Sequence, residues 1–291
     1  MAISILNPYR NAGLPWLRGN LHTHTTNSDG PRSPQATVDV YAARGYDFLM
    51  LSDHDQVSDV SGLDARGMAL IAGNEVSANG PDLLHVHATR RIEPQADRQA
   101  VIDAIEADGG FAVFCHPNWQ THFNHCPQDG LEAWSGYAGI EIYNGVIRWL
   151  PGSPLATDRW DRLLGEGRRI WGYANDDCHR LDDVGVAWNV VQAERGNGTD
   201  IVRALREGCF YASTGVTIDR IEVCGRALHI ETADAQCIVA HSDYAAREAF
   251  VDASSMTLEL PEDFAKKYVR FECWGTGQRM AWNQPFFVYR V

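Results

Sequence analysis

The chain has 291 residues, of which 45% are hydrophobic and 22% are charged, and this balance excludes a collagen-like, low-complexity or wholly disordered protein. Lys and Arg number 25 against 38 Asp and Glu, so the net charge is −13. So acidic a chain is a poor candidate for binding a nucleic-acid polymer or an anionic membrane surface, because both need clustered positive charge. A small anionic substrate stays compatible with this charge.

The sequence contains neither an apolar run of about 18 residues nor the basic and apolar segments of a signal peptide. We therefore expect a cytoplasmic protein. Its cysteines are odd in number, scattered, and form no CxxC pair, which argues against a disulfide framework or a zinc ribbon. We expect most of them to be buried thiols. They are Cys115, Cys126, Cys178, Cys209, Cys224, Cys237 and Cys273.

Short apolar runs alternate with helix-like stretches as far as Gly215, which is typical of βα units with parallel strands. Seven or eight such strands suggest a closed or nearly closed barrel. The predicted strands lie near 19–24, 47–52, 69–74, 82–88, 110–115, 138–143, 169–174 and 186–192. The predicted helices are 34–44, 95–108, 156–167 and 199–208, the first with Ser33 as its cap and Pro34 in its first turn.

The pattern of apolar and polar residues changes after Gly215. From Thr217 onward, short alternating stretches are separated by turn residues and show little helical periodicity. This pattern predicts a small antiparallel β domain. The predicted domains are therefore a barrel over residues 1–215 and a β-rich accessory domain over 216–291.

His, Asp and Glu residues occur where the predicted strands of the barrel stop. In a parallel barrel the carboxyl ends of the strands open on one face, so these side chains are expected to converge there. Alternate residues of a strand point to the same side, so two His in an HxH motif can reach one ion. Imidazole and carboxylate ligands suit zinc, manganese or iron. The residues are His22, His24, Asp53, His54, Glu75, His85, His87, His116, Asp177 and His179.

Together these motifs, NLHTHTTNSDG, LMLSDHD, GNEVS, FCHP and DxH, resemble the PHP (polymerase and histidinol phosphatase) superfamily of metallohydrolases. The opening LRGNLHTHT and the YASTG and AWNQPFFV segments are similar to CehA/McbA-like members. The resemblance implies a distorted (βα)7 barrel and two to three divalent metal ions, Mn, Zn or Fe, in a trinuclear centre.

The resemblance also implies a ligand set for each ion. His22, His24, Glu75 and Asp177 would hold the first ion. The second would bind Glu75, His85 and His116, with Glu75 bridging the two. The third would bind Asp29, His54 and His179, although Asp29 stands where many family members have His.

Each of the other residues on the predicted active face has two possible roles. Asp53 either orients a metal-bound imidazole or water, or caps the following helix. His87 and His122 would touch the substrate, and His87, His122 or a metal-bound water would protonate the leaving group. For the loop residues His122 and His125, a solvated position is the more common alternative. The remaining substrate-binding candidates are Asn144, which also suits a turn, and Arg180, which also suits a surface ion pair.

The predicted function is a metal-dependent phosphoesterase that hydrolyses a small phosphomonoester or a cyclic or nucleotide phosphodiester, with a metal-bridging hydroxide as nucleophile. One alternative is a carbamate or carboxylic-ester hydrolase with the same metal centre. A second alternative is a non-catalytic, metal-stabilised binding module. The sequence leaves the substrate, the native metal and the oligomeric state open.

Overall fold

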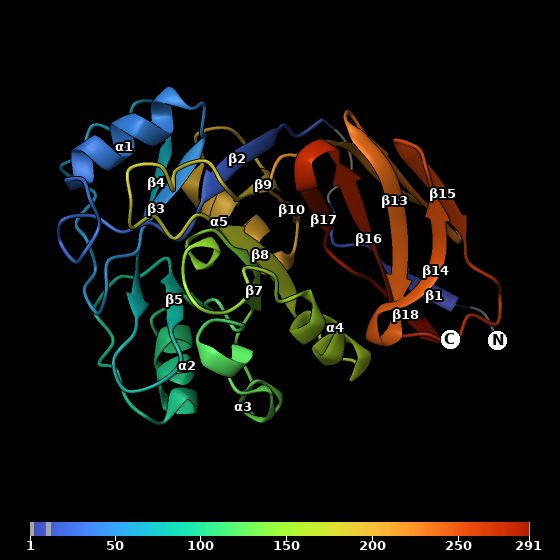
Figure 1. The fold of residues 1–291 in the computed structure, drawn as a ribbon, viewed down its shortest axis with the longest axis horizontal. Coiled ribbons are helices and arrows are strands. Elements are labelled where there is room, and N and C mark those ends of the chain that lie inside the picture. The colour runs from blue at the N-terminus through green and yellow to red at the C-terminus, as the bar shows by residue number, and fades with distance from the viewer. Residues whose placement is uncertain (1–2, 10–12, 291) are drawn as a thin grey trace.

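The computed structural model describes residues 3–9 and 13–290 as a mixed α/β protein. Figure 1 shows two regions side by side: strands surrounded by helices, and a stack of β-strands from the C-terminal part of the chain.

The strands of the first region are hydrogen-bonded neighbours in chain order from β2 to β8. β2 pairs with β3 and β3 with β4 in parallel, and so do β6 with β7 and β7 with β8. Their bounds are β2 (Trp16–Asn20), β3 (Phe48–Leu51), β4 (Ala69–Val76), β5 (Leu83–Val86), β6 (Phe111–Phe114), β7 (Gly139–Asn144) and β8 (Trp171–Asn175). Each predicted strand of this region overlaps an observed one, but the strand predicted near 19–24 shares only residues 19–20 with β2.

The strand β5 departs from the prediction, because it runs antiparallel to both of its neighbours, β4 and β6. The turn between β4 and β5 is short, and a parallel strand would need a long crossover connection instead. Residues 52–82 are all described and contain no helix. The strictly alternating βα pattern predicted for this region is therefore wrong at β5.

The two ends of this strand series approach each other without a continuous ladder among the described residues. Thr23, after β2, forms an isolated parallel bridge with Cys178, after β8. The next strand, β9 (Trp188–Gln192), pairs antiparallel with β2. Its Asn189 side chain donates to the carbonyl of Ala174 in β8 at 2.9 Å and accepts from the same residue's amide at 3.1 Å. A closed seven-stranded (βα)7 barrel stays a prediction.

The helices begin and end at the residues that cap them. The Oγ of Ser33 accepts from the amide of Ala36 at 3.4 Å, as the sequence predicts, and Asp97 and Asn197 cap two further helices. The described helices are α1 (Pro34–Ala43), α2 (Arg98–Ala107), α3 (Gln128–Ala133), α4 (Thr157–Gly165) and α5 (Gly198–Glu207). The short α3 was not predicted from the sequence.

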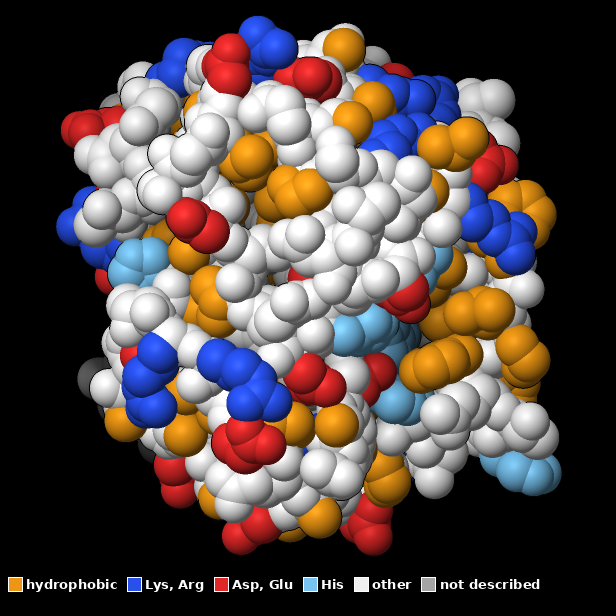
Figure 2. All heavy atoms as spheres, turned by 90° about the vertical axis from the view of Figure 1, so that its left-hand side faces the viewer, with side chains coloured by type: hydrophobic (Ala, Val, Ile, Leu, Met, Phe, Trp, Pro, Cys, Tyr) orange, Lys and Arg blue, Asp and Glu red, His pale blue; other side chains and the backbone are white. Residues whose placement is uncertain are grey.

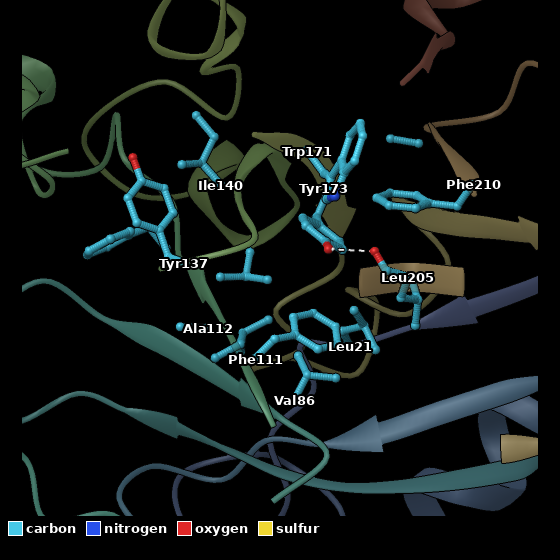
Figure 3. Close-up of a cluster of buried hydrophobic side chains, with 14 of the residues drawn as sticks. Leu21, Val86, Phe111, Ala112, Tyr137, Ile140, Trp171, Tyr173, Leu205 and Phe210 are labelled. Carbon is cyan, nitrogen blue, oxygen red and sulfur yellow. Dashed lines mark hydrogen bonds between the residues drawn. The ribbon is translucent and has the colours of Figure 1, made fainter. Parts of the chain in front are cut away.

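A buried apolar cluster fills the space between these helices and strands (Figure 3). Leu21, Phe111 and Phe210 are among its members. Tyr173 lies in the same cluster, and its hydroxyl donates to the carbonyl of Leu205 at 2.9 Å, so the buried polar atom is satisfied. This core fixes the strand ends from which the predicted metal-binding side chains project.

The C-terminal region consists of two packed β-sheets. A core of apolar side chains, including Ile230 and Phe271, lies between them. One sheet contains β11 (Ile218–Cys224), β12 (Ala227–Thr232) and β15 (Ser255–Glu259). The other contains β13 (Ala235–Ser242), β14 (Ala246–Val251), β16 (Tyr268–Gly275), β17 (Met280–Asn283) and β18 (Phe286–Arg290).

The second sheet is continuous with the first region, because β17 pairs with β10 (Phe210–Ser213), which in turn pairs with β9. The N-terminal strand β1 (Ile3–Leu6) pairs with β18 and lies beside it in Figure 1. Residues 3–6 thus pair with the C-terminal sheets. The predicted domain boundaries had placed them in the barrel, within residues 1–215.

The cysteines are free, and five of the seven are buried, so the prediction of mostly buried thiols is confirmed. Among the helices that the structure describes, none combines the length and the apolar character needed to span a membrane.

Candidate metal centre

Most of the predicted ligands stand directly after strand ends and meet on one side of the molecule. Backbone contacts bring the loops together: His54 forms a bridge with Glu75, and the amide of Asp177 donates to the carbonyl of His22 at 3.0 Å. The residues brought together are His22, His24, Asp29, His54, Glu75, His116, Asp177 and His179. Asp177 and His116 have positive φ angles of 53° and 30°, a conformation that is strained for non-glycine residues and that clusters at functional sites.

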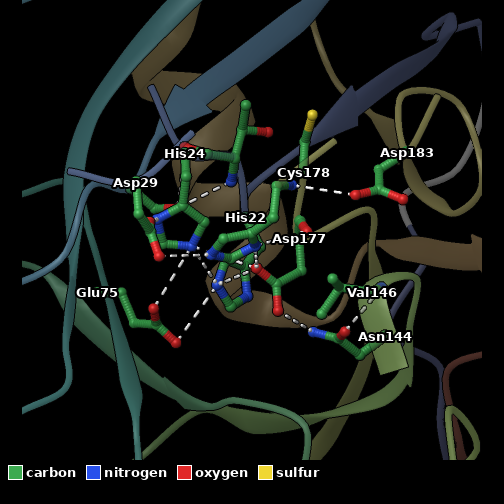
Figure 4. Close-up of polar contacts among 12 residues, drawn as sticks. His22, His24, Asp29, Glu75, Asn144, Val146, Asp177, Cys178 and Asp183 are labelled. Carbon is green, nitrogen blue, oxygen red and sulfur yellow. Dashed lines mark hydrogen bonds and ion pairs between the residues drawn. The ribbon is translucent and has the colours of Figure 1, made fainter. Parts of the chain in front are cut away.

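His22 is at the centre of an inner group of buried side chains (Figure 4). Its Nδ1 lies 2.9 Å from Oε1 of Glu141, so this nitrogen carries the proton of the neutral ring. Its Nε2 then presents a lone pair to Nε2 of His24 at 3.1 Å, to Oδ1 of Asp177 at 3.2 Å and to Oε1 of Glu75 at 3.3 Å. Such a set of lone pairs is repulsive unless a cation or a proton lies among them.

Without a bound cation, protons take that place in the inner group. Burial disfavours a charged imidazolium at His22, but Asp177, Glu75 and Glu141 outweigh it and hold the His22 pKa well above its usual range. Burial raises the pKa of Glu75, but the neighbouring His side chains lower it by more, so that this pKa is well below its ordinary value. The pKa of Asp177 is also well below its ordinary value, because burial raises it less than the neighbouring His side chains lower it. The inner group is therefore a buried arrangement of carboxylates that attracts positive charge.

An outer group surrounds Asp29, whose side chain is half exposed. Its carboxylate lies 3.5 Å from Nε2 of His54, 3.3 Å from Nε2 of His179 and 3.7 Å from Nδ1 of His24. Burial lowers the pKa of His54 and of His179, but the close carboxylates of Asp29 and of Glu75 or Asp177 raise these pKa values to about 10 and about 11. The Asp29 pKa is held far below its usual range by His179 and His54.

A third group adjoins Glu75 on its other side and contains a residue that the sequence did not predict. Nε2 of His116 lies 3.3 Å from Oε1 of Glu75 and 3.7 Å from Oδ2 of Asp82. His125 contacts Asp82 as well: its Nε2 accepts from the Asp82 amide at 3.0 Å and lies 3.2 Å from Oδ2. Burial and the nearby Glu75 raise the Asp82 pKa.

These groups fit divalent cations by the chemistry of their donors. Both carboxylate oxygens of Glu75 and Oδ1 of Asp177 are buried and accept no hydrogen bond of regular geometry from the described residues. The nitrogens nearest to them belong to other predicted ligands: Nδ1 of His54 lies 2.9 Å from Glu75, and Nδ1 of His179 lies 3.1 Å from Asp177. Buried polar atoms are almost always paired, so these oxygens are explained by an ion that they would bind. Mixed imidazole and carboxylate donors within a few ångströms of one another suit zinc, manganese or iron.

The structure does not bring His85 to these groups, which corrects its predicted role in the second ligand set. Because β5 is antiparallel, its beginning and not its end lies with the carboxyl ends of its neighbours. Asp82, which precedes β5, therefore occupies the place expected for His85. The buried His85 ring instead lies 3.3 Å from Asp108, and burial lowers its pKa to about 4.

Two other predicted residues also lie away from the centre. His87 follows β5 at the same remote end and is exposed. His122 is exposed in the loop after β6 and does not line the cleft described below. Neither residue is placed to contact a substrate at the metal-binding groups or to protonate its leaving group, and both roles are corrected.

Asp53 and Asn144 hold other residues in place. The Asp53 carboxylate accepts from the amide of Thr25 at 2.8 Å and from Oγ of Ser28 at 2.8 Å, and Ser28 in turn contacts His24 at 3.3 Å. Asp53 thus fixes the loop that carries His24 and Asp29, and does not cap a helix. The amide of Asn144 donates to Oδ2 of Asp177 at 3.1 Å, so it orients this carboxylate instead of a substrate.

Glu141 in β7 supports several of the ligand loops, and it was not predicted from the sequence. Besides His22, it accepts hydrogen bonds from the amide of His116 and from the side chains of Asn144 and Asn175, at 2.7 to 2.8 Å. A signal was present: Glu141 is a lone charged residue inside the apolar segment Gly139–Asn144, which is nearly all buried. A buried carboxylate in a strand needs partners, and these partners are the ligand loops.

A cleft of about 330 Å³ opens over the three groups. Figure 2 shows it as a hollow in which His and acidic side chains meet hydrophobic ones. Predicted ligands and Asp82 form one side, and apolar residues after β6 and β7 form the other. Arg180 is the one cation among the described residues that line the cleft, apart from the histidines.

Residues 167–209 match the model of a family described as PHP-associated. A two-domain protein from Bacteroides vulgatus, described as containing a predicted PHP-like metal-dependent phosphoesterase, is similar in structure with a TM-score of 0.57, 16% identity and 98% coverage of both chains. This likeness shows a shared fold. Together the two findings support the PHP superfamily, whereas the narrower CehA/McbA-like placement is not confirmed.

Two further solved structures are similar over part of the chain. An amidohydrolase from Chromobacterium violaceum has a TM-score of 0.43, with 16% identity over 57% of this chain and 88% of its own. PsfC from Pseudomonas syringae has a TM-score of 0.47, with 16% identity over 65% of this chain and 88% of its own. No curated protein matches the sequence.

Proposed function

We propose that this protein is a metal-dependent phosphoesterase that hydrolyses a small phosphomonoester or a cyclic or nucleotide phosphodiester. The observation that carries the proposal is the set of buried oxygens on Glu75 and Asp177 at the floor of an open cleft, which face other predicted ligands without regular hydrogen bonds. A purely structural metal site is closed by its ligands, whereas a catalytic site keeps an open position. Here the groups border a cleft large enough for a small molecule.

The proposed ligands differ from the predicted set at one position. His22, His24, Glu75 and Asp177 would hold the first ion, and Glu75, His116 and Asp82 the second, with Asp82 in the role predicted for His85. Asp29, His54 and His179 would hold a third. Two to three Mn, Zn or Fe ions bound there would supply an acidified water as nucleophile and positive charge for the phosphoryl oxygens.

The protein's own residues would bind and orient the ester. Arg180 is exposed and forms no ion pair with the described residues, so it can pair with an anionic oxygen of the substrate. The apolar side of the cleft would exclude water and strengthen this interaction. Asn144 and Glu141 would keep Asp177 and His22 in position throughout, since their hydrogen bonds already exist without substrate.

A carbamate or carboxylic-ester hydrolase with the same centre is the second candidate. One observation favours it: a single Arg lines the cleft among the described residues, whereas phosphate sites often use several cations. The third candidate is a non-catalytic binding module in which the metal only stabilises the fold, and it would not need an open position at the metal-binding groups.

The test is a substrate screen of the Mn²⁺-loaded protein with p-nitrophenyl phosphate, bis-p-nitrophenyl phosphate and naphthyl carbamates. The proposal expects phosphate ester hydrolysis that is lost in His22→Ala while the variant stays folded by circular dichroism. Hydrolysis of the carbamates alone would establish the second candidate. Metal binding without turnover of any of these esters would support the third and contradict the proposal.

A further inference from the structure

The apolar side of the cleft is large for a site whose proposed task is to hold a phosphate. It consists of Trp119, Val146, Ile147, Trp149 and Leu150, which we call the apolar wall. Trp149 and Leu150 are 51% and 37% exposed, although monomeric proteins usually bury such large apolar side chains. Exposed aromatic surface inside a cleft is typical of a binding site.

The wall is already ordered by the protein's own contacts. Its two halves come from different loops, and Trp119 and Gly152 join these loops by an antiparallel bridge. The Gln120 amide also donates to the carbonyl of Pro151 at 2.9 Å. The Trp119 ring packs edge-on against the ring of His116, with centroids 5.0 Å apart. The wall thus begins at a predicted metal ligand, and a ligand would not need to order these loops.

Trp149 is tied to the opposite loop by the buried Asp183. The indole Nε1 donates to Oδ1 of Asp183 at 3.2 Å. The other oxygen of Asp183 accepts from the backbone amides of His179 at 3.1 Å and of Arg180 at 2.8 Å. One carboxylate therefore fixes the aromatic ring, a predicted metal ligand and the cleft's Arg relative to one another.

The guanidinium of Arg180 lies 5.6 Å from the centre of the Trp149 ring. A ligand that binds its anion to Arg180 and to the metal-binding groups would thus have its remaining part beside the exposed indole. A flat aromatic group gains most from this contact, because aromatic rings attract one another beyond simple area burial. An alkyl group would gain less.

We propose that the cleft selects phosphoesters whose organic group is a planar aromatic ring, bound against Trp149 while Arg180 pairs with the phosphate. The inference rests on the proposed function for the identity of the anion. The cavity volume of about 330 Å³ limits the ligand to a small molecule, since ligand pockets of about 300–1,000 Å³ hold drug-sized compounds.

The experiment compares two stable phosphonates, phenylphosphonate and methylphosphonate, by calorimetric titration of the full chain loaded with Mn²⁺. We expect the phenyl compound to bind about tenfold tighter, as an aromatic contact of this kind predicts. Trp149→Ala should reduce the ratio to about twofold without weakening methylphosphonate, and Trp149→Phe should keep most of it. Arg180→Gln should weaken both compounds by a similar factor, because both carry the anion.

Leu181→Ala is the matched control, since Leu181 is 64% exposed beside Arg180 but does not line the cleft. It should leave both affinities unchanged. Equal binding of the two phosphonates, failure of phenylphosphonate to bind, or an unchanged ratio in Trp149→Ala would overturn the inference. Hydrolysis of phenyl phosphate is measured in parallel: selective binding without hydrolysis supports the inference and contradicts the proposed function.

Discussion

Glu141 Oε1 lies 2.9 Å from Nδ1 of His22, and neither side chain is exposed to solvent. This contact sets the tautomer of His22, so that Nε2 is the nitrogen left to bind a cation. Groups that orient a metal-binding imidazole contribute strongly to metal affinity.

Replacement of Glu141 should therefore weaken metal binding although Glu141 is not itself a proposed ligand. In Glu141→Gln, the amide places a donor against the donors of His116 and Asn144. We expect metal affinity to fall by about 10- to 100-fold, as for other partners of metal-binding His. Titration with Mn²⁺ against a chelating indicator measures this. Glu166→Gln, on the exposed end of α4, is the control, and equal affinities in the two variants would contradict the prediction.

If the proposed function holds, the direction of β5 makes Asp82, and not His85, a ligand of the second ion. Asp82→Asn should lose about one bound equivalent, because a neutral amide is a poor substitute for a carboxylate ligand. His85→Leu keeps the buried volume similar and should retain the full metal content. Elemental analysis after dialysis distinguishes them. Loss of metal in His85→Leu with none in Asp82→Asn would restore the ligand set predicted from the sequence.

Asp82 and His85 illustrate which features of this fold can be predicted from the sequence and which cannot. The apolar segment Phe48–Leu51 and the capped helix at Ser33 are specified locally, so they could be predicted from neighbouring residues. The direction of a strand depends on its pairing partners, and a run such as LLHV has the same pattern in either direction. The predicted position of His85 followed from an assumed parallel strand, and that assumption was wrong.

The supporting residues were missed for a related reason. Glu141 becomes informative only when four donors from distant segments are seen around it. His22, His24 and Glu75 were found because their types and their positions at strand ends carry the chemistry on their own. Their actual role as ligands stays a prediction.

Metal binding should release protons at neutral pH. In the metal-free protein the pKa values of His54 and His179 are raised to about 10 and about 11, so both rings carry a proton at pH 7. A cation binds only the unprotonated nitrogen, so apparent affinity should rise as the pH increases toward these values. Calorimetric titration in two buffers of different ionisation enthalpy should give different heats. Identical heats would show that no proton is released.

The same raised pKa values have an opposite consequence for the stability of the metal-free protein. A raised pKa means that the folded state binds protons more tightly than the unfolded chain, in which the His pKa is about 6.5. The stabilisation from His54 and His179 should thus be complete below about pH 6.5 and lost as the pH rises through about 10 to 11. Urea unfolding of the metal-free protein across this range measures it, and constant stability would contradict it.

A buried ion pair joins the two regions of the protein. Arg270 in β16 donates through Nε to Oδ1 of Asp161 in α4 at 2.8 Å, and Tyr268 donates to the same oxygen at 2.7 Å. Arg270→Met should lower the free energy of unfolding by about 3–5 kcal/mol, because it leaves the buried carboxylates of Asp161 and Glu272 without their shared partner.

The double variant Asp161→Leu/Arg270→Met is the control for that prediction. It removes the charges of Asp161 and Arg270 and leaves only Glu272 without its partner, so it should recover part of the lost stability. Urea unfolding of the single and double variants decides between these outcomes. If the double variant were less stable than Arg270→Met, the loss would come from packing and not from the unpaired charge.

The central claim is that residues far apart in the sequence form one site for several divalent cations, with Glu75 shared between two of them. The most direct test counts the Mn²⁺ ions bound per chain by equilibrium dialysis and elemental analysis, in the wild-type protein and in Glu75→Gln. The account predicts two to three ions in the wild type and at most one in the folded variant, because Glu75 belongs to the first two ligand sets and not to the third. A folded wild-type protein that binds no ion, or a variant that binds as many as the wild type, would contradict it.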